Sequence, residues 1–256
     1  GGLGIRSASE ISLPAYLSSV SATSEHITPL LPIYLRNGSN PFFTQATIQW
    51  STLLSGEEFP VLKSVQAAWD IPLCKKRFEN LLQSADTLED KARLKAVSSE
   101  HASDWLNCIP LPSLSLKLNR QSLRIAVALR LGSRICRPHK CHCTDTTSGQ
   151  PITVDIKGLH GLSCASAAGK GRIARHDRAN DLIHRALASA NYHCILEPTG
   201  LCRDKKRPDG FSLYPYAEGK ILAWDYTCRN TLADTYREHT AEEVGYAAKE
   251  GEKEKF

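Results

Sequence analysis

The stretch of sequence that decides the fold is residues 207–228, which read RPDGFSLYPYAEGKILAWDYTC. Aliphatic and aromatic residues dominate it on both sides of Glu218-Gly219, a pair that suits a tight turn. We therefore expect a hairpin of two strands, 208–214 and 220–228. Pro208 lacks an N–H and suits the first residue of a strand. This placement puts Asp209 at the start of the first strand and Asp225 within the second.

Asp209 and Asp225 are the candidate catalytic residues. Adjacent antiparallel strands can bring two such carboxylates together, and carboxylate oxygens hold one or two Mg²⁺ ions beside a scissile phosphate. Asp225 stands between apolar neighbours, where an ionised carboxylate needs a cation or hydrogen bonds. Glu197 and Asp177 both remain open as a third acidic ligand.

The residues before and after the hairpin predict a small α/β core. Residues 172–190 have apolar side chains at helical spacing, and 192–196 predict a strand that Pro198 ends. Residues 231–256 predict a charged helix. Helix, strand, hairpin and helix, in that order, are typical of a small nuclease core with a short mixed sheet.

A second pattern combines cysteine and histidine. Cys141 and Cys143 are followed by His160 and Cys164, which gives C-x-C…H-x-x-x-C. Thiolates and imidazole are the ligands that tetrahedral Zn²⁺ prefers, and two close pairs joined by a longer loop usually supply them. Nine cysteines without a secretory signal also favour metal binding over a disulfide framework. Three neighbours remain open as replacement ligands, namely Cys136, His139 and His142.

The remaining sequence defines three regions of an α+β protein. Residues 1–131 carry helical periodicity and predict a helical region, 134–171 predict a loop-rich zinc knuckle, and 172–256 form the nuclease-like core. The composition is 41% hydrophobic and 23% charged. No apolar run approaches the roughly 18 residues of a membrane span, so we expect no membrane partner.

Positive charge gathers in residues 166–207, although the formal net charge is only +5. Such a stretch can follow a phosphate backbone, and DNA is the expected partner. The alternative is a solvated basic helix face. The candidate nucleic-acid contacts are Arg172, Arg175, Arg178, Lys206 and Arg207.

Several short motifs together carry a family resemblance. In chain order they are residues 160–164 (HGLSC), 171–176 (GRIARH), 196–198 (LEP), 207–210 (RPDG) and 224–227 (WDYT). They resemble successive motifs of the restriction-like, PD-(D/E)xK endonuclease at the end of non-LTR retrotransposon polyproteins. The resemblance is specific over about 134–228 and loose before that, where residues 2–6 are similar to the stretch after a reverse-transcriptase palm and 1–131 would be thumb and linker.

The resemblance implies a nuclear DNA endonuclease that nicks target DNA for target-primed reverse transcription of element RNA. Its catalytic acids map onto Asp209 and Asp225, with structural Zn²⁺ in the knuckle and catalytic Mg²⁺ at the acids. The (D/E)xK pattern has a lysine where this sequence has Thr227. The candidates for that lysine are Lys249, Lys253, Lys255 and Lys220, of which the family's late helix favours Lys249 or Lys253.

A different class of function remains open beside the enzyme. Thr227 is compatible with a catalytically inactive, nucleic-acid-binding remnant that keeps the knuckle and the basic helix. The sequence contains no Met, so we expect a fragment of a longer protein, with the last helix of the nuclease core cut short. No polymerase Tyr-x-Asp-Asp motif is present, which excludes reverse transcription by this fragment alone.

Overall fold

The computed structural model describes residues 2–36, 38–114, 116–145, 148–164, 171–200 and 207–254. The chain divides into two compact units, Gly2–Ala85 and Asp86–Phe256. The predicted α+β class is confirmed, with helices in both units and small sheets in the second.

The unit Gly2–Ala85 is helical, as predicted. Its elements are α1 (Ala8–Ile27), η1 (Thr28–Leu30), α2 (Ile33–Arg36), α3 (Pro41–Leu54) and α4 (Gln66–Gln83). The core forms where α1, α3 and α4 meet around Leu17, Trp50 and Trp69, all of which are buried. The two indole rings meet edge to face at 5.4 Å. Each indole N–H donates to a backbone carbonyl, so neither buries an unsatisfied donor.

The unit Asp86–Phe256 begins with helices and then alternates short helices with two small sheets. Its helices are α5 (Leu88–Val97), α6 (Asp104–Asn107), η2 (Pro112–Leu114), α7 (Arg120–Leu131), η3 (Leu159–Leu162), α8 (Gly171–Ser189), α9 (Asp234–Glu242) and α10 (Tyr246–Lys253). Its strands are β1 (His139–Thr144), β2 (Pro151–Val154), β3 (Cys194–Leu196), β4 (Gly210–Ala217) and β5 (Lys220–Trp224).

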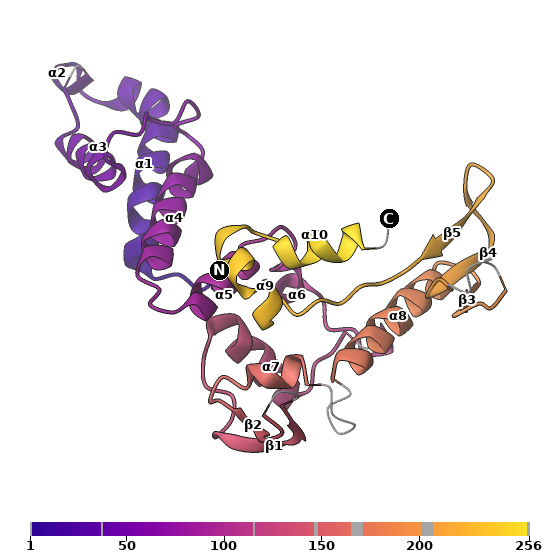
Figure 1. Ribbon diagram of the computed structural model, residues 1–256. Helices are drawn as coiled ribbons and strands as arrows, with labels where there is room; N and C mark the ends of the chain where they lie inside the picture. The colour runs from indigo at the N-terminus through magenta and orange to yellow at the C-terminus, as the bar shows by residue number, and fades with distance from the viewer. Residues whose placement is uncertain are drawn as a thin grey trace. The chain divides into compact units, whose positions relative to one another are not determined.

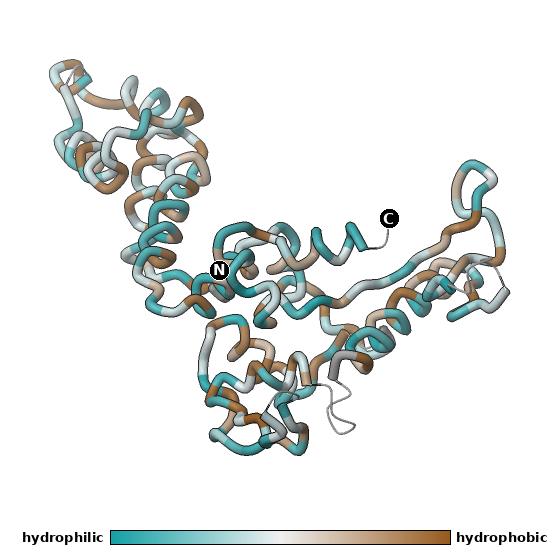
Figure 2. Tube along the Cα trace, in the orientation of Figure 1, coloured by the Kyte–Doolittle hydropathy of each residue, from teal (hydrophilic) through white to brown (hydrophobic). Residues whose placement is uncertain are grey.

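The sheets are antiparallel. β1 pairs with β2, and the second sheet has the order β3-β4-β5 with both pairings antiparallel. The predicted mixed sheet is therefore wrong for the described residues, because β3 also pairs antiparallel with β4, beside the β4-β5 hairpin that the sequence predicted. The predicted turn is confirmed: Glu218 and Gly219 both have positive φ, at 49° and 74°, as a type I′ hairpin turn requires. Its tip is hydrophilic (Figure 2).

Helix α8 packs against β3 (Figure 1), and it also makes a polar contact with the end of β5. Asn180 of α8 is 5% exposed and accepts a hydrogen bond from the Trp224 indole N–H at 2.7 Å. The Trp224 ring in turn lies over Gly210, where a Cβ would stand 2.1 Å from Cζ2 of the ring. Gly210 therefore lets β4 and β5 close beneath the ring.

Two helices, α9 and α10, stand where the sequence predicted one helix over 231–256. Glu243 adopts an extended conformation and Gly245 has φ 79°, and these two residues interrupt the helix. α9 packs against α5, with an ion pair of 2.8 Å between Arg237 and Glu89. Strand β5 also ends at Trp224, four residues before the predicted strand end.

Candidate functional site

The Cys/His cluster consists of Cys141, Cys143, His160 and Cys164, whose ligand atoms all lie within 4.8 Å of one another. Alternate residues of a strand share one face, so β1 presents Cys141 and Cys143 together while their neighbours in the strand are exposed. One turn of η3 supplies the second pair, since the Cys164 N–H donates to the His160 carbonyl at 2.9 Å. The predicted quartet therefore converges and could bind a metal ion such as zinc.

The spacing inside the cluster agrees with a tetrahedral ion. With Zn–S bonds of about 2.3 Å, two thiolates on one tetrahedral ion lie about 3.8 Å apart. The sulfurs of Cys141 and Cys164 lie 3.7 Å apart. Cys143 Sγ and His160 Nε2 lie 3.0 Å apart, somewhat closer than the corresponding tetrahedral edge.

The three replacement ligands are placed elsewhere. Cys136 donates from its thiol to the Asp155 carbonyl at 3.1 Å, and Nδ1 of His139 lies 2.9 Å from the Arg137 carbonyl. His142 is exposed and alternates with Cys141 and Cys143 along β1. Within the described residues the cluster thus keeps its four predicted members.

The crowding of thiols changes their acidity. Burial, followed by the neighbouring Cys141 and Cys164, raises the pKa of Cys143 to about 12. Three thiolates side by side are unfavourable unless a cation compensates their charge. A bound metal ion reverses this balance and deprotonates the coordinating thiols.

The acid pair Asp209 and Asp225 flanks the ends of β4 and β5. Gly210 pairs with Trp224 and Phe211 with Ala223, so Asp209 and Asp225 are the next residues outward from the last pair of this ladder. On the other side, the Glu197 N–H donates to the Asp209 carbonyl at 2.9 Å. The backbones of the three acids predicted from the sequence therefore stand side by side at one end of the sheet.

The carboxylate of Asp209 is held from two sides. Its Oδ2 lies 3.1 Å from Nε2 of His176 and accepts a 2.5 Å hydrogen bond from the Tyr226 N–H. Its side chain is only 14% exposed. Asn180 also donates to the Asp209 carbonyl, at 3.2 Å. Helix α8 and the segment after β5 together fix this acid.

Asp225 is exposed and opens onto a different space. It lines a pocket of about 410 Å³, named here the Asp225 pocket, together with Pro208, Thr227 and residues of α10 that include Gly251 and Glu252. In the part of the chain that the structure describes, three or more Cys, His, Asp or Glu ligand atoms converge only at the Cys/His cluster. The ligand atoms of the three predicted carboxylates, Asp209, Asp225 and Glu197, do not converge in this way.

The other predicted catalytic residues have partners of their own. Glu197 has φ 46° and forms a 2.8 Å ion pair with Arg207. Lys249 pairs with Glu243, and Lys253 with Glu250 at 2.6 Å. Neither lysine lines the Asp225 pocket. Lys255 lies outside the described residues.

The predicted nucleic-acid contacts differ in their environment. Arg175 is partly buried and donates to the Leu162 carbonyl at 2.6 Å, which links α8 to η3. Arg178 is exposed on α8, and Arg207 pairs with Glu197. Lys206 and the side chain of Arg172 lie outside the described residues.

Sequence reasoning did not select His176, Asn180 or Tyr226 as site residues, although all three contact Asp209. The periodicity of α8 gives a signal for two of them. His176 and Asn180 stand four positions apart and therefore on one helix face, next to the apolar positions that pack on the sheet. A polar pair beside the apolar face of α8 indicates that this helix contacts a polar group of the sheet.

The comparisons with known proteins give no family. No family model, curated protein or solved structure matches the chain. None of the helices in the described ranges has the length and apolar character needed to cross a bilayer.

Proposed function

We propose that this chain is the metal-dependent DNA endonuclease region of a retrotransposon-derived protein, which nicks target DNA in the nucleus for target-primed reverse transcription of element RNA. The observation that carries the proposal is the pairing of Gly210 with Trp224 at the end of the β4-β5 hairpin. Asp209 and Asp225 are the next residue on each strand, so a continuation of this register would set them opposite each other. Directly opposite residues of antiparallel strands have Cβ atoms about 4.5–5.5 Å apart. This spacing allows two carboxylates to share one metal ion or a close pair of ions.

In this proposal each nearby residue has a distinct task. Asp209 and Asp225 hold Mg²⁺, which when bound supplies the Lewis acid for phosphodiester hydrolysis. The His176 ring and the Tyr226 N–H keep the Asp209 carboxylate oriented before substrate arrives. Zinc in the Cys/His cluster stabilises η3 and β1-β2, and the exposed Arg178 contacts the DNA backbone.

The experiment is a nicking assay on supercoiled plasmid with Mg²⁺, using the whole chain. Asp209→Asn and Asp225→Asn each remove one anionic oxygen ligand, and we expect each to abolish nicking while DNA affinity stays within about twofold. Asp234→Asn is the matched control, because that side chain is 89% exposed at the start of α9. Nicking that persists in Asp209→Asn would contradict the proposal.

A second candidate function is a catalytically inactive nucleic-acid-binding module. The observation in its favour is the placement of the late lysines, since Lys249 and Lys253 are paired with Glu243 and Glu250 instead of the acid pair. In addition, the hydroxyl of Thr227, at the usual lysine position, is buried without a hydrogen-bond partner. This candidate predicts DNA binding that requires zinc, without nicking in Mg²⁺ or Mn²⁺.

A further inference from the structure

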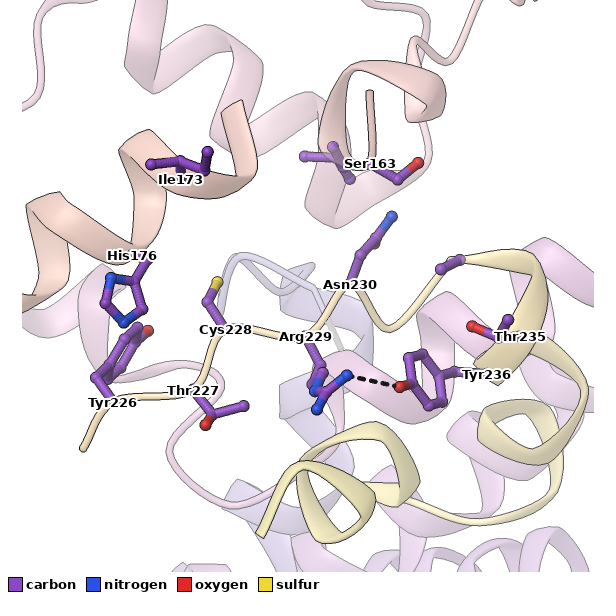
Figure 3. Close-up of a pocket in the computed structure, with 12 residues that line it drawn as sticks. Ser163, Ile173, His176, Tyr226, Thr227, Cys228, Arg229, Asn230, Thr235 and Tyr236 are labelled. Carbon is purple, nitrogen blue, oxygen red and sulfur yellow. Dashed lines mark hydrogen bonds between the residues drawn. The ribbon is translucent and has the colours of Figure 1, made fainter. Parts of the chain in front are cut away.

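A cavity of about 530 Å³, named here the His176 cavity, is lined by His176 and Tyr226, which contact Asp209. Its walls come from α8 (Ile173, His176), the segment 226–230 after β5, α9 (Tyr236) and Ser163, the residue after η3. Figure 3 shows these residues around a common space, with His176 and Tyr226 on one side and Tyr236 on the other. Its volume lies within the roughly 300–1,000 Å³ of small-molecule sites.

The walls combine ring faces with hydrogen-bonding groups. The rings of His176 and Tyr226 lie 6.0 Å apart, centre to centre, and are tilted by 56°. Across the cavity, Arg229 donates to the Tyr236 hydroxyl at 3.1 Å. Asn230 accepts from the Leu232 N–H through Oδ1, which leaves its amide N–H groups as donors, and Figure 3 shows this side chain extending toward Ser163. Flat rings with amide and hydroxyl groups at their edges match a planar heterocycle with polar edges.

Two residues of the cavity wall also contact Asp209. His176 and Tyr226 line the cavity, and both also contact the Asp209 carboxylate, one through its ring and the other through its backbone N–H. A group held in the cavity is therefore separated from Asp209 by one residue of the cavity wall. Burial, as the main cause, raises the pKa of the Tyr226 phenol, so this phenol stays uncharged at neutral pH.

We infer that the His176 cavity binds one unstacked nucleobase of a single-stranded nucleic-acid segment. Every base has a π-face, so stacking on side-chain rings tolerates different bases, and the polar edges supply hydrogen bonds. The inference deepens the proposed function, on which its link to cleavage rests. A base in this cavity places its own strand beside Asp209, so the substrate is a strand with at least one unpaired nucleotide next to the scissile phosphate.

The test compares two single strands of equal charge. The whole, zinc-loaded chain is kept in a buffer without EDTA and without Mg²⁺. It is titrated with a strand of twelve deoxythymidine nucleotides and with an abasic deoxyribose-phosphate strand of the same length. Stacking of one base is worth about 5- to 150-fold in affinity. We expect the deoxythymidine strand to bind more tightly by a factor in this range.

Matched variants assign that preference to the cavity. Ala233 lines the cavity, so Ala233→Leu fills part of it with aliphatic bulk. Ala174 is exposed on α8 and is not among the lining residues, so Ala174→Leu is the control. We expect the first to reduce the base preference to below about twofold and the second to leave it unchanged. Asn230→Asp keeps the acceptor for Leu232 and removes the amide donors, and it should lower the preference by about threefold or more.

Equal affinity of the wild-type protein for the two strands would overturn the inference. So would a preference that Ala233→Leu and Asn230→Asp both leave intact in folded, zinc-loaded protein. Because binding is measured without Mg²⁺, the result is separate from cleavage. A base preference in a protein that fails to nick plasmid supports the cavity and contradicts the endonuclease proposal alone.

Discussion

His176 on α8 reaches across to Asp209 at the start of β4, with 3.1 Å between Nε2 and the carboxylate Oδ2. The same oxygen accepts the Tyr226 N–H. The direction of the Asp209 carboxylate is therefore set by two elements outside its own strand. In metal sites, groups that orient a ligand typically contribute 10- to 100-fold to affinity or activity.

The first prediction concerns His176 as a positioning residue. His176→Ala should lower the nicking rate about 10- to 100-fold and raise the Mg²⁺ concentration needed for half-maximal rate, because Asp209 loses one of its two orienting contacts. His176→Gln, which retains an N–H donor, should recover part of the rate. A loss without any change in Mg²⁺ dependence, equal in both variants, would contradict the positioning role.

The contact between His176 and Asp209 could not be predicted from the sequence. The residue types and spacing of RPDG and WDYT predicted a hairpin and two facing acids, and the antiparallel pairing of β4 with β5 confirms the hairpin. The direction of the Asp209 side chain could not be predicted from these motifs. Asp209 turns toward His176 of α8, 33 residues earlier in the chain, and no local pattern encodes a contact over that separation.

The second prediction tests the close approach of Gly210 to Trp224. A Cβ at position 210 would lie 2.1 Å from the Trp224 ring, so Gly210→Ala must displace the ring or separate the strands. We expect a loss of about 1–3 kcal/mol in the free energy of unfolding, as for other overpacked sites, measured by urea denaturation. Gly161→Ala is the control, because nothing lies within 4 Å of its Cβ position. Equal midpoints for both variants would contradict the packing described here.

The third prediction concerns the Cys/His cluster. We expect one zinc ion per chain in purified protein, and we expect Cys164→Ser to lose it, because a structural zinc site needs all four ligands. Chelation should remove the hydrogen-exchange protection of β1 and β2, whose hairpin has little apolar core to stabilise it. Cys108→Ser, at an exposed cysteine, should retain the metal. A full zinc content in Cys164→Ser would rule out this ligand set.

In the zinc region, the metal ligands could be predicted from the sequence, but the secondary structure could not. Ligand types and paired spacing were sufficient to predict the quartet, because few other roles gather Cys and His so closely. The β1-β2 hairpin was not predicted. Its residues are mostly polar and metal-binding, so the apolar alternation that indicates a strand is absent from His139–Thr144. The break at Gly245 was missed for a related reason, since the charged flanking sequence continues to favour a helix.

The fourth prediction uses the helical unit Gly2–Ala85. The hydrogen bond from Arg6 is the main cause that lowers the pKa of Asp70 below its ordinary 3.8; a second guanidinium bond of 2.7 Å joins the same pair. A lowered folded-state pKa stabilises the fold above pH 3.8, and this contribution is lost as pH falls through the folded value.

Asp70→Asn should therefore reduce the stability of this unit by about 1 kcal/mol at pH 7, as expected for a partly buried hydrogen-bonded ion pair. The difference from wild type should shrink below pH 3.8. Hydrogen exchange of α1 and α4 measures it locally. Glu25→Gln, at an exposed carboxyl, should show no such pH-dependent difference. A constant difference for Asp70→Asn down to pH 2.5 would contradict the linkage.

The last prediction concerns Arg175 and Arg178, for which the sequence predicted the same role. Both Arg175 and Arg178 were predicted as phosphate contacts, but Arg175 donates to the Leu162 carbonyl and ties α8 to η3, whereas Arg178 is exposed. Each phosphate contact contributes about one unit to the slope of log affinity against log salt. Arg178→Ala should flatten this slope for duplex DNA by about one unit without changing thermal stability. Arg175→Ala should lower thermal stability, because a partly buried carbonyl loses its charged donor, and should change the slope less. If Arg175→Ala flattens the slope by a full unit at unchanged stability, the guanidinium contacts phosphate and its bond to Leu162 gives way on binding.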